Sequence, residues 1–242
     1  MGEKQLLPTD STQNAQLRLI AMSEISTPTD NDSEIAALFG RLNPRSDADV
    51  EAMKTAKAER EGTAALATLK LKANVPLRHW ERTVDRSGPW ATTESGLRQK
   101  LGTGFMVALC GTNGGGKTQL GVELIRHQMA VRFKSALFTD TMQFFMAIKA
   151  SYRSDKETEK QVIGRFLEPQ LLVIDEMDKR AETAWENNML FYMVNQRYNA
   201  VLDTVMLFNA DSTTASTQLG PSVVSRLNET GGLVDCKWPT RR

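Results

Sequence analysis

A glycine-rich run that ends in lysine and threonine is the part of this 242-residue chain best suited to chemistry. Its spacing matches G-x-x-x-x-G-K-[ST], with an apolar run before it and helix-forming residues after it. Glycines let a loop turn its amides toward phosphate oxygens, and a helix N-terminus favours negative charge. We therefore predict a Walker A phosphate loop that binds a nucleoside triphosphate through Gly111, Thr112, Asn113, Gly114, Gly115, Gly116, Lys117, Thr118 and Gln119. Lys117 would neutralise the β and γ phosphates, and the Thr118 hydroxyl would coordinate Mg²⁺.

Two adjacent carboxylates stand at the end of the run QLLVIDE at residues 170–176. Asp175, the first of the two, is placed to give a second magnesium contact, directly or through water, as in a Walker B motif. The adjacent Glu176 could orient a water molecule for attack on the γ phosphate. A small-molecule kinase has no use for such a base, so the pair favours an ATPase over a kinase. The alternative is a strand that simply ends in solvated acids.

Two further side chains lie downstream. Asn209, in the run MLFNAD, could reach the γ phosphate or the attacking water from the opposite side, although Asn at this place is also a common turn residue. Arg226, in VVSRL, could donate positive charge to the nucleotide of a neighbouring copy. A surface salt bridge is the alternative for this arginine.

Apolar runs that alternate with helical stretches must position these residues. The strands are expected at 105–110, 135–139, 170–175, 204–211 and 231–238, with a helix after the phosphate loop and a long helix over 182–199. Runs of Leu, Val and Ile without alternation are typical of central parallel strands, so we predict a doubly wound α/β fold. Residues 141–166 are expected to form a helical insert, and no helical lid is expected after the fifth strand.

The N-terminal part has a different composition. Residues 1–33 are polar and are expected to be mostly a flexible tail, while 34–74 should form two helices that end near Pro76. Residues 75–242 are predicted to form the ATPase domain.

Composition sets further limits. Hydrophobic content of 40%, charged content of 24% and a net charge of +1 are those of an ordinary globular protein without a global attraction to nucleic acid. No apolar run is long enough to span a membrane, and the N-terminus lacks a secretion signal, so a cytoplasmic protein is expected. Cys110 and Cys236 lie in apolar runs and are expected to be reduced core residues.

Taken together, the chain resembles the AAA+ ATPases and, among them, the DnaC-type replicative helicase loaders and their IstB-type relatives. The resemblance covers residues 74–242 and includes the stretches VPLRHW, LLVIDEMD, VNQRYN, LFNAD, QLGPSVVSRL and CKWPTRR. It implies that Asn209 is the sensor 1 residue, Arg226 the arginine finger and Arg241 the sensor 2 arginine. Gln119 departs from the histidine usual in the family, and the N-terminal region matches no family pattern.

The resemblance also implies partners. A loader of this kind would bind a DnaB-type hexameric replicative helicase through its N-terminal helices, associate with itself through the ATPase domain, and use ATP, Mg²⁺ and single-stranded DNA during replication initiation. Single-strand binding needs cations and aromatic rings. Lys149, Arg153, Phe144 and Tyr152 offer both in the helical insert, whereas Phe145 and Ile148 are expected to be core residues.

Three alternatives stay open. An IstB-type transposition helper would share the core but act with a transposase on duplex DNA. A P-loop kinase or nucleotide transferase fits less well with Glu176 and Arg226. A non-hydrolysing adaptor would hold its nucleotide only as a structural element.

Overall fold

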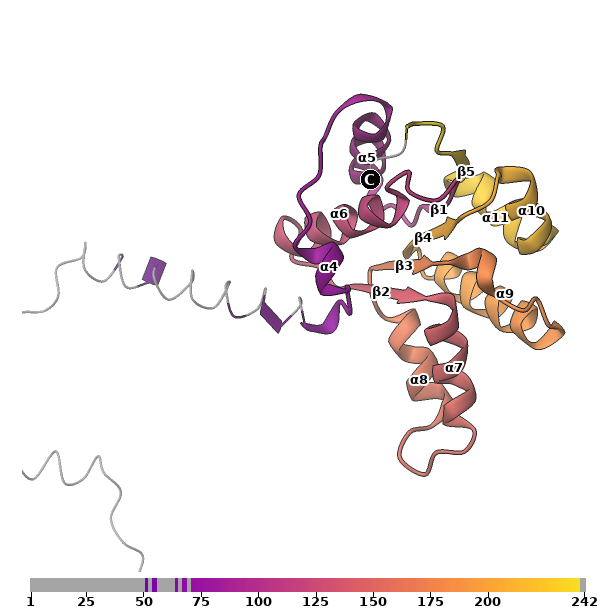
Figure 1. Ribbon diagram of the computed structural model, residues 1–242. Helices are drawn as coiled ribbons and strands as arrows, with labels where there is room; N and C mark the ends of the chain where they lie inside the picture. The colour runs from indigo at the N-terminus through magenta and orange to yellow at the C-terminus, as the bar shows by residue number, and fades with distance from the viewer. Residues whose placement is uncertain (1–50, 52–53, 56–63, 65–66, 69–70, 240–242) are drawn as a thin grey trace, which may run out of the picture. The chain divides into compact units, whose positions relative to one another are not determined.

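A parallel β-sheet is the centre of the protein. The structure, a computed structural model, describes residues 51, 54–55, 64, 67–68 and 71–239 (Figure 1). Its five strands run in the order β2-β3-β4-β1-β5, and every neighbouring pair is parallel. They are β1 (Met106–Cys110), β2 (Ala136–Asp140), β3 (Leu171–Asp175), β4 (Asp203–Phe208) and β5 (Gly232–Asp235). The predicted α/β fold with a parallel sheet is confirmed.

Helices cover both faces of the sheet, as Figure 1 shows. Because side chains alternate along a strand, Val107 and Leu109 of β1 face one layer and Met106 and Ala108 face the other. The first layer holds α5 (Gly88–Lys100) and α6 (Lys117–Ala130). The second holds α7 (Thr141–Ser151), α8 (Glu159–Leu167), α9 (Ala184–Asn199), α10 (Ser212–Leu219) and α11 (Pro221–Thr230). The strands are therefore apolar on both faces, as their composition predicted.

Polar caps set where several elements begin and end. The strand expected over 204–211 stops at Phe208, because Asp211 caps α10 by accepting a hydrogen bond from the Thr214 amide at 2.7 Å. The predicted helix over 182–199 begins at Ala184, because Thr183 is its N-cap. The insert predicted over 141–166 is two helices, and Thr158 begins the second with a capping box.

Residues before α4 (Leu77–Trp80) are described only in part. The described residues at 51, 54–55, 64, 67–68 and 71–72 are helical, in the range where helices were expected. Residues 1–50 lie outside the described part, so the boundaries at 33 and 74 stay predictions. Ala73 and Asn74 are tied to β2: the Ala73 carbonyl accepts a hydrogen bond from the Phe138 amide at 2.8 Å, and Asn74 Nδ2 donates one to the Phe138 carbonyl at 3.2 Å.

At its other end the described chain continues past β5 through residues 236–239 without forming a helix. None of the helices described here is both long and apolar enough to cross a membrane.

A buried arginine holds the edge of the sheet where the strands begin. Arg197 of α9 has no exposed surface. Its Nε donates to Thr204 Oγ1 at 2.9 Å, and its Nη1 donates to the Phe166 and Pro169 carbonyls, both at 2.9 Å. Its Nη2 donates to the Asp203 carbonyl at 2.6 Å. Burial of a charge is costly, and these acceptors offset the cost while they join the ends of α8 and α9 to β4.

Replacing this residue tests its structural role. Arg197→Met should lower the free energy of unfolding by about 3 kcal/mol, because several buried carbonyls lose their donor. Urea unfolding followed by circular dichroism measures the change. Arg165→Met, which removes an exposed arginine of α8, is the matched control and should cost less than about 1 kcal/mol. Equal losses in the two variants would contradict the anchoring role of Arg197.

Candidate nucleotide site

The carboxyl ends of β1, β3 and β4 lie next to one another and open into a cavity of about 1050 Å³. In a parallel α/β sheet this edge is where ligands bind. The cavity is lined by Arg78, His79, Glu81, Arg82, Asn113, Gly114, Gly116, Lys117, Thr118, Gln119, Asp175, Glu176 and Asn209. The structure thus brings together the predicted phosphate loop, the two carboxylates and Asn209.

The phosphate loop (residues 111–118) has the backbone that its glycines predict. Gly111, Gly114 and Gly116 have positive φ angles of 147°, 86° and 82°, which disfavour any residue with a side chain. Gly116 is the N-cap of α6, so no side chain bonds to the first amides of that helix. A helix N-terminus whose amides have no side-chain cap can bind an anion.

The Lys117 side chain folds back over this loop. Its Nζ donates to the Gly111 and Thr112 carbonyls, both at 2.9 Å, so the ammonium group lies directly above the turn. Burial lowers its pKa, while neighbouring Cys236 and Asp175 oppose that shift. A phosphate group would favour the charged form of this lysine.

Two tryptophans, one before β1 and one after β5, hold the loop from outside. Trp90 Nε1, in α5, donates to the Gly116 carbonyl at 3.1 Å. Trp238 Nε1, beyond β5, donates to the Gly115 carbonyl. Both rings are buried, and sequence reasoning assigned neither of them to the site. The turn at SGPW and the stretch CKWPTRR were noticed, but a tryptophan gives no local sign of the carbonyl to which it will bond.

Asp175 and Thr118 meet at the far side of the loop. Thr118 Oγ1 donates to Asp175 Oδ2 at 2.7 Å, and the Asp175 residue is 9% exposed. Burial raises the pKa of Asp175, and the hydrogen bonds from Thr118 and from the Glu176 amide act in the opposite direction. A hydroxyl beside a carboxylate is an oxygen donor set that suits magnesium, and the cavity has room for a nucleotide, so these residues fit Mg²⁺ with ATP.

Glu176 has an unusual backbone. Its φ and ψ angles are 55° and 40°, in the left-handed region that few non-glycine residues adopt. The side chain is exposed and lines the cavity. Burial raises its pKa, and so do the charges of Asp175, Asp140 and Asp178. A more basic carboxylate at the mouth of a phosphate site can accept a proton from water, and strained backbone of this kind is common at functional sites.

Asn209 is held by a residue that sequence reasoning did not single out. Its backbone amide donates to Asp178 Oδ1 at 3.0 Å, and Asn209 itself lines the cavity. Asp178 belongs to the short 3₁₀ helix η1 (Met177–Lys179) that follows the carboxylate pair. Asp178 therefore fixes the end of β4, which Asn209 directly follows.

Gln119 bonds to the chain outside the loop. Its Nε2 donates to the His79 carbonyl at 3.2 Å and lies 3.4 Å from Glu123 Oε1. The residue that departs from the family histidine thus connects α6 to α4.

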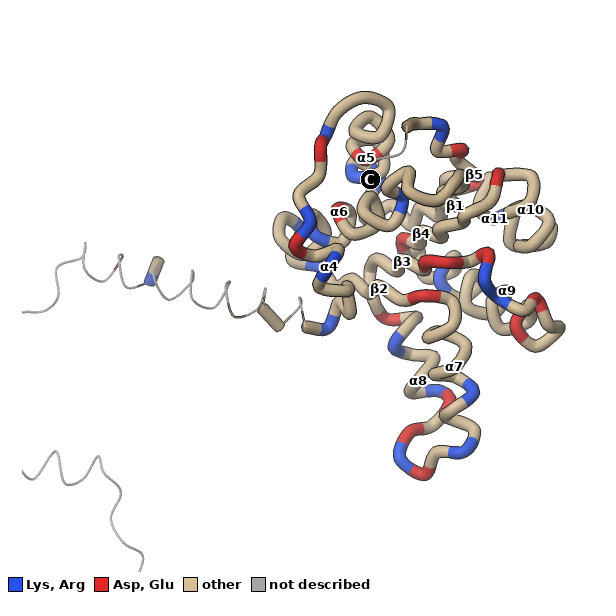
Figure 2. The backbone as a smooth tube through the Cα atoms, viewed as in Figure 1, with Lys and Arg blue, Asp and Glu red and all other residues tan. Residues whose placement is uncertain are grey.

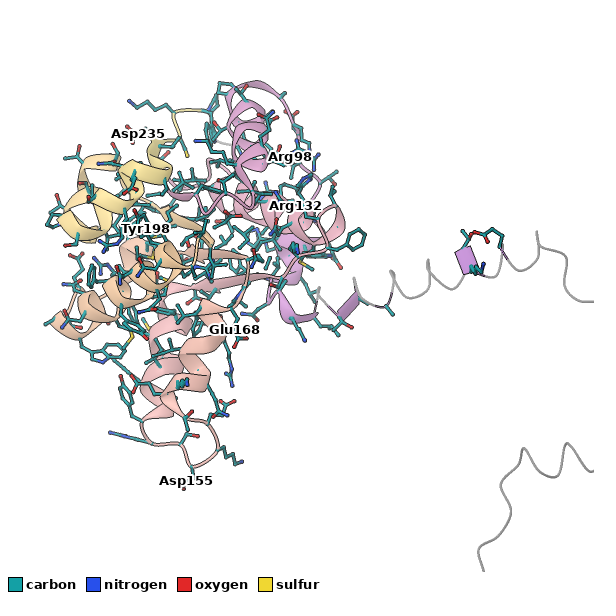
Figure 3. All side chains as sticks on the ribbon, turned by 180° about the vertical axis from the view of Figure 1, so that it is seen from behind. Arg98, Arg132, Asp155, Glu168, Tyr198 and Asp235 are labelled. Carbon is teal, nitrogen blue, oxygen red and sulfur yellow. The ribbon has the colours of Figure 1, made fainter. Side chains whose placement is uncertain are left out.

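Arg226 does not line this cavity. Its Nη2 donates to Asn195 Oδ1 at 2.6 Å, and its guanidinium lies 5.1 Å and 5.5 Å from the ring centres of Phe191 and Tyr198. Tyr198 is labelled on α9 in Figure 3. Within the described part of the chain Arg226 forms no ion pair, so the salt-bridge alternative finds no partner there. Arg241, the predicted sensor 2 residue, lies outside the described residues.

The predicted DNA contacts divide into exposed and buried residues. Tyr152 is 51% exposed, and Arg153 is also exposed at the end of α7. Lys149 Nζ lies 4.8 Å from the ring centre of Trp185, a residue that sequence reasoning missed. Phe144 is 2% exposed and packs edge-on against Phe166, so in this structure it is a core residue that cannot stack on a base.

The structure also tests four residues that were predicted to lie in the core. Phe145 is 4% exposed and Ile148 is fully buried, which confirms their predicted place in the core. Cys110 and Cys236 are free and buried, as predicted, and burial raises the pKa of both thiols to about 12.

The parallel sheet, the phosphate loop at the end of β1 and the carboxylates at the end of β3 define a P-loop protein with an AAA+ core. Residues 49–211 match the family of IstB-like ATP binding proteins, and the chain belongs to this family.

Relatives of known name add detail. The chain is 27% identical over 117 residues to the replicative helicase loaders DnaC of Escherichia coli (strain K12) and Shigella flexneri. That match covers 48% of this chain and 47% of each relative, so the chain spans about half the length of the curated relatives it matches.

Solved structures support the fold. The crystal structure of the DnaC helicase loader matches with a TM-score of 0.57 and 21% identity, covering 65% of this chain and 98% of that one. Domain III of the Thermotoga maritima replication initiation protein DnaA matches with a TM-score of 0.54 and 15% identity, covering 62% and 64%. At these identities the two likenesses show a shared fold.

The position of Glu176 leads to a prediction. Glu176→Gln should leave ATP affinity within about threefold and lower the rate of hydrolysis by about a hundredfold or more, because the amide cannot accept a proton. Steady-state phosphate release and equilibrium binding of ATP measure the two effects. Glu168→Gln, at the C-terminal end of α8, is the control and should hydrolyse ATP at the wild-type rate. Unchanged hydrolysis in Glu176→Gln would favour a nucleotide with a purely structural role.

Proposed function

We propose that this protein is an ATPase that binds a DnaB-type hexameric replicative helicase and places it on single-stranded DNA during replication initiation. The observation that carries the proposal is the likeness to the DnaC loaders, which holds in sequence over 117 residues and in fold over 65% of the chain. Membership of the IstB-like ATP binding family supports the use of ATP.

In the proposed mechanism the phosphate loop binds the triphosphate through its amides and Lys117, and Thr118 and Asp175 would hold Mg²⁺. The metal ion, when bound, supplies positive charge to the β and γ phosphates. Glu176 orients a water molecule at the γ phosphate and accepts its proton. Asn209 contacts the γ phosphate or the attacking water from the neighbouring strand end. The Asp178 bond to the Asn209 amide supports this role, since it fixes the strand end beside Glu176.

Self-association would complete the site. Arg226 lies outside the cavity of its own chain, so its charge would act on the nucleotide of an adjacent copy, after it leaves Asn195 and the aromatic rings of α9. An arginine supplied in this way makes hydrolysis depend on assembly. Turnover would then be slow in the isolated chain and faster in the complex.

The proposed surface for single-stranded DNA lies where α7 meets the start of α9. Lys149 lies over the ring of Trp185, whose Nε1 donates to the Tyr152 hydroxyl at 3.2 Å. This arrangement of a cation with two aromatic side chains suits a phosphate beside a stacked base. Figure 2 shows acidic and basic residues mixed at the tip of the α7–α8 hairpin, which favours the α9 side of α7 over the tip.

A buried arginine beside this cluster adds positive charge. Arg180 is 7% exposed, and in the described part of the chain its Nε and Nη2 have no hydrogen-bond partner. It borders a cavity of about 90 Å³ together with Lys149, Lys179 and Glu186. Among the structural neighbours, a DnaA solved with single-stranded DNA matches with a TM-score of 0.55.

An IstB-type transposition helper is the second candidate, because the matching family bears that name and includes residues 49–211 of this chain. It would use the same nucleotide site but act with a transposase on duplex DNA. A kinase or a non-hydrolysing adaptor has no comparable support.

Complex formation tests the loader function. With ATP, light scattering should show the replicative helicase of the source cell as a hexamer that carries several copies of the full chain. Removal of residues 1–70 should abolish the complex and leave ATP binding intact. The deletion stops before Ala73, because that residue is buried and bonded to β2. A transposase complex in place of the helicase complex would favour the second candidate.

The DNA surface leads to a further prediction. Trp185→Ala should weaken binding to an oligodeoxythymidine by about tenfold, through the loss of one stacked base. Lys149→Ala should reduce the slope of log K against log salt by about 0.7, the value for one phosphate contact on a single strand. Fluorescence anisotropy measures both effects.

Lys156→Ala, at the hairpin tip, is the matched control and should leave both quantities unchanged. Tighter binding of the wild-type protein to a duplex of equal length would count against a single-strand loader.

A further inference from the structure

The helix α7 begins directly beside the carboxylates of the nucleotide site. β2 and β3 are paired up to Asp140 and Asp175, and α7 starts at the next residue, Thr141. The Thr141 hydroxyl donates a hydrogen bond to the Asp175 carbonyl at 3.0 Å and lies 3.4 Å from Met177 Sδ. Asp175 and Met177 are the two neighbours of Glu176 in the chain. One side chain of α7 therefore contacts the backbone just before Glu176 and the side chain just after it.

The sequence around Thr141 leaves its hydroxyl free for this contact. Asp140 is the N-cap of α7 and accepts a hydrogen bond from the Gln143 amide at 2.7 Å, so the helix does not need the threonine as its cap. Because Thr141 is the first residue of the helix, no earlier turn of α7 offers its hydroxyl a carbonyl. Thr141 is 1% exposed and does not line the nucleotide cavity. It can therefore affect a reaction there only through the residues that it holds.

The backbone of Glu176 needs such support. Its left-handed conformation costs free energy in a residue with a side chain, and such a conformation persists only where the surroundings fix it. The Glu176 amide donates to Asp175 Oδ1 at 2.7 Å, and the Glu176 carbonyl accepts from the Lys179 amide at 2.9 Å. Both bonds are local to this stretch of chain. The bond from Thr141 comes from another element, and it fixes the peptide group between Asp175 and Glu176 relative to α7.

A second contact holds the same segment from the side of β4. Asp178 Oδ1 accepts a hydrogen bond from the Asn209 amide at 3.0 Å. The segment from Asp175 to Asp178 is thus held at two points, by α7 on one side and by the end of β4 on the other. Glu176 lies between these two points in the chain, and its side chain takes part in neither contact.

We propose that Thr141 is a positioning residue for ATP hydrolysis: its hydroxyl fixes the peptide group that precedes Glu176 and thereby aims the Glu176 carboxylate at the attacking water. A general base must lie within hydrogen-bond distance of the proton that it accepts, and small displacements lower the rate steeply. The inference rests on the proposed ATPase activity and does not depend on the helicase as partner.

Removal of the hydroxyl tests this role. Thr141→Val keeps the shape of the side chain and should lower the single-turnover rate of ATP hydrolysis about tenfold, the effect of losing one buried hydrogen bond. ATP affinity should stay within about twofold of the wild type, because Thr141 lies outside the cavity. Thr141→Ser retains the hydroxyl and should keep at least about half of the wild-type rate.

Ser151→Ala is the matched control. Ser151 is a buried residue at the other end of the same helix, and its hydroxyl donates to the Ile148 carbonyl at 2.7 Å. This variant should hydrolyse ATP at the wild-type rate. Melting temperatures without nucleotide show whether each variant is folded, and Thr141→Ala carries the test if Thr141→Val does not fold.

A double variant shows whether Thr141 acts through Glu176. If it does, Thr141→Val should change the rate by less than about twofold in a protein that already carries Glu176→Gln. A further tenfold loss in the double variant would overturn the role of Thr141, and so would wild-type hydrolysis in folded Thr141→Val.

The single variants separate failure of this inference from failure of the proposed function. If Glu176→Gln hydrolyses ATP at the wild-type rate, the proposed base is wrong and the role of Thr141 is wrong with it. Slow hydrolysis in Glu176→Gln together with wild-type hydrolysis in Thr141→Val would remove the role of Thr141 alone.

Discussion

A phosphate-binding loop has to leave its amides without partners in the protein, while something else holds its carbonyls in place. The carbonyls of the loop at 111–118 are held by side chains from three separate parts of the chain. Lys117 bonds to the carbonyls of Gly111 and Thr112 from above, and two tryptophan ring nitrogens take those of Gly115 and Gly116. The amides at the start of α6 have no side-chain cap, so an anion can reach them.

The order of the strands brings the remaining polar groups of the site together in one cavity. Because β3 and β4 lie directly beside each other, the carboxylates after one and Asn209 after the other open into the same cavity. The opposite edge is fixed by Arg197, whose buried guanidinium joins the ends of α8 and α9 to β4. The edge that carries the site keeps a strained residue in Glu176, whereas Arg197 at the opposite edge bonds to four acceptors.

Local patterns in the sequence were enough to predict the fold and the residues of the phosphate loop. Apolar runs predicted the five strands, and the spacing of glycine, lysine and threonine predicted the loop, because both signals lie within a few adjacent residues. Three residues were missed because each bonds to a backbone group far from it in the chain; they are Asp178, Trp90 and Trp238. Phe144 was expected at the surface because a single sequence does not show which face of an aromatic helix is covered.

The two tryptophans have a thermodynamic consequence. One lies before β1 and the other after β5, and both bond to the same short loop. A ligand that orders the loop should therefore, by linkage, lower the equilibrium population in which either flanking segment is open, even though it touches neither strand. Hydrogen exchange at positions far apart in the chain would then respond together to one nucleotide, so that the loop joins the two ends of the domain into one cooperative unit.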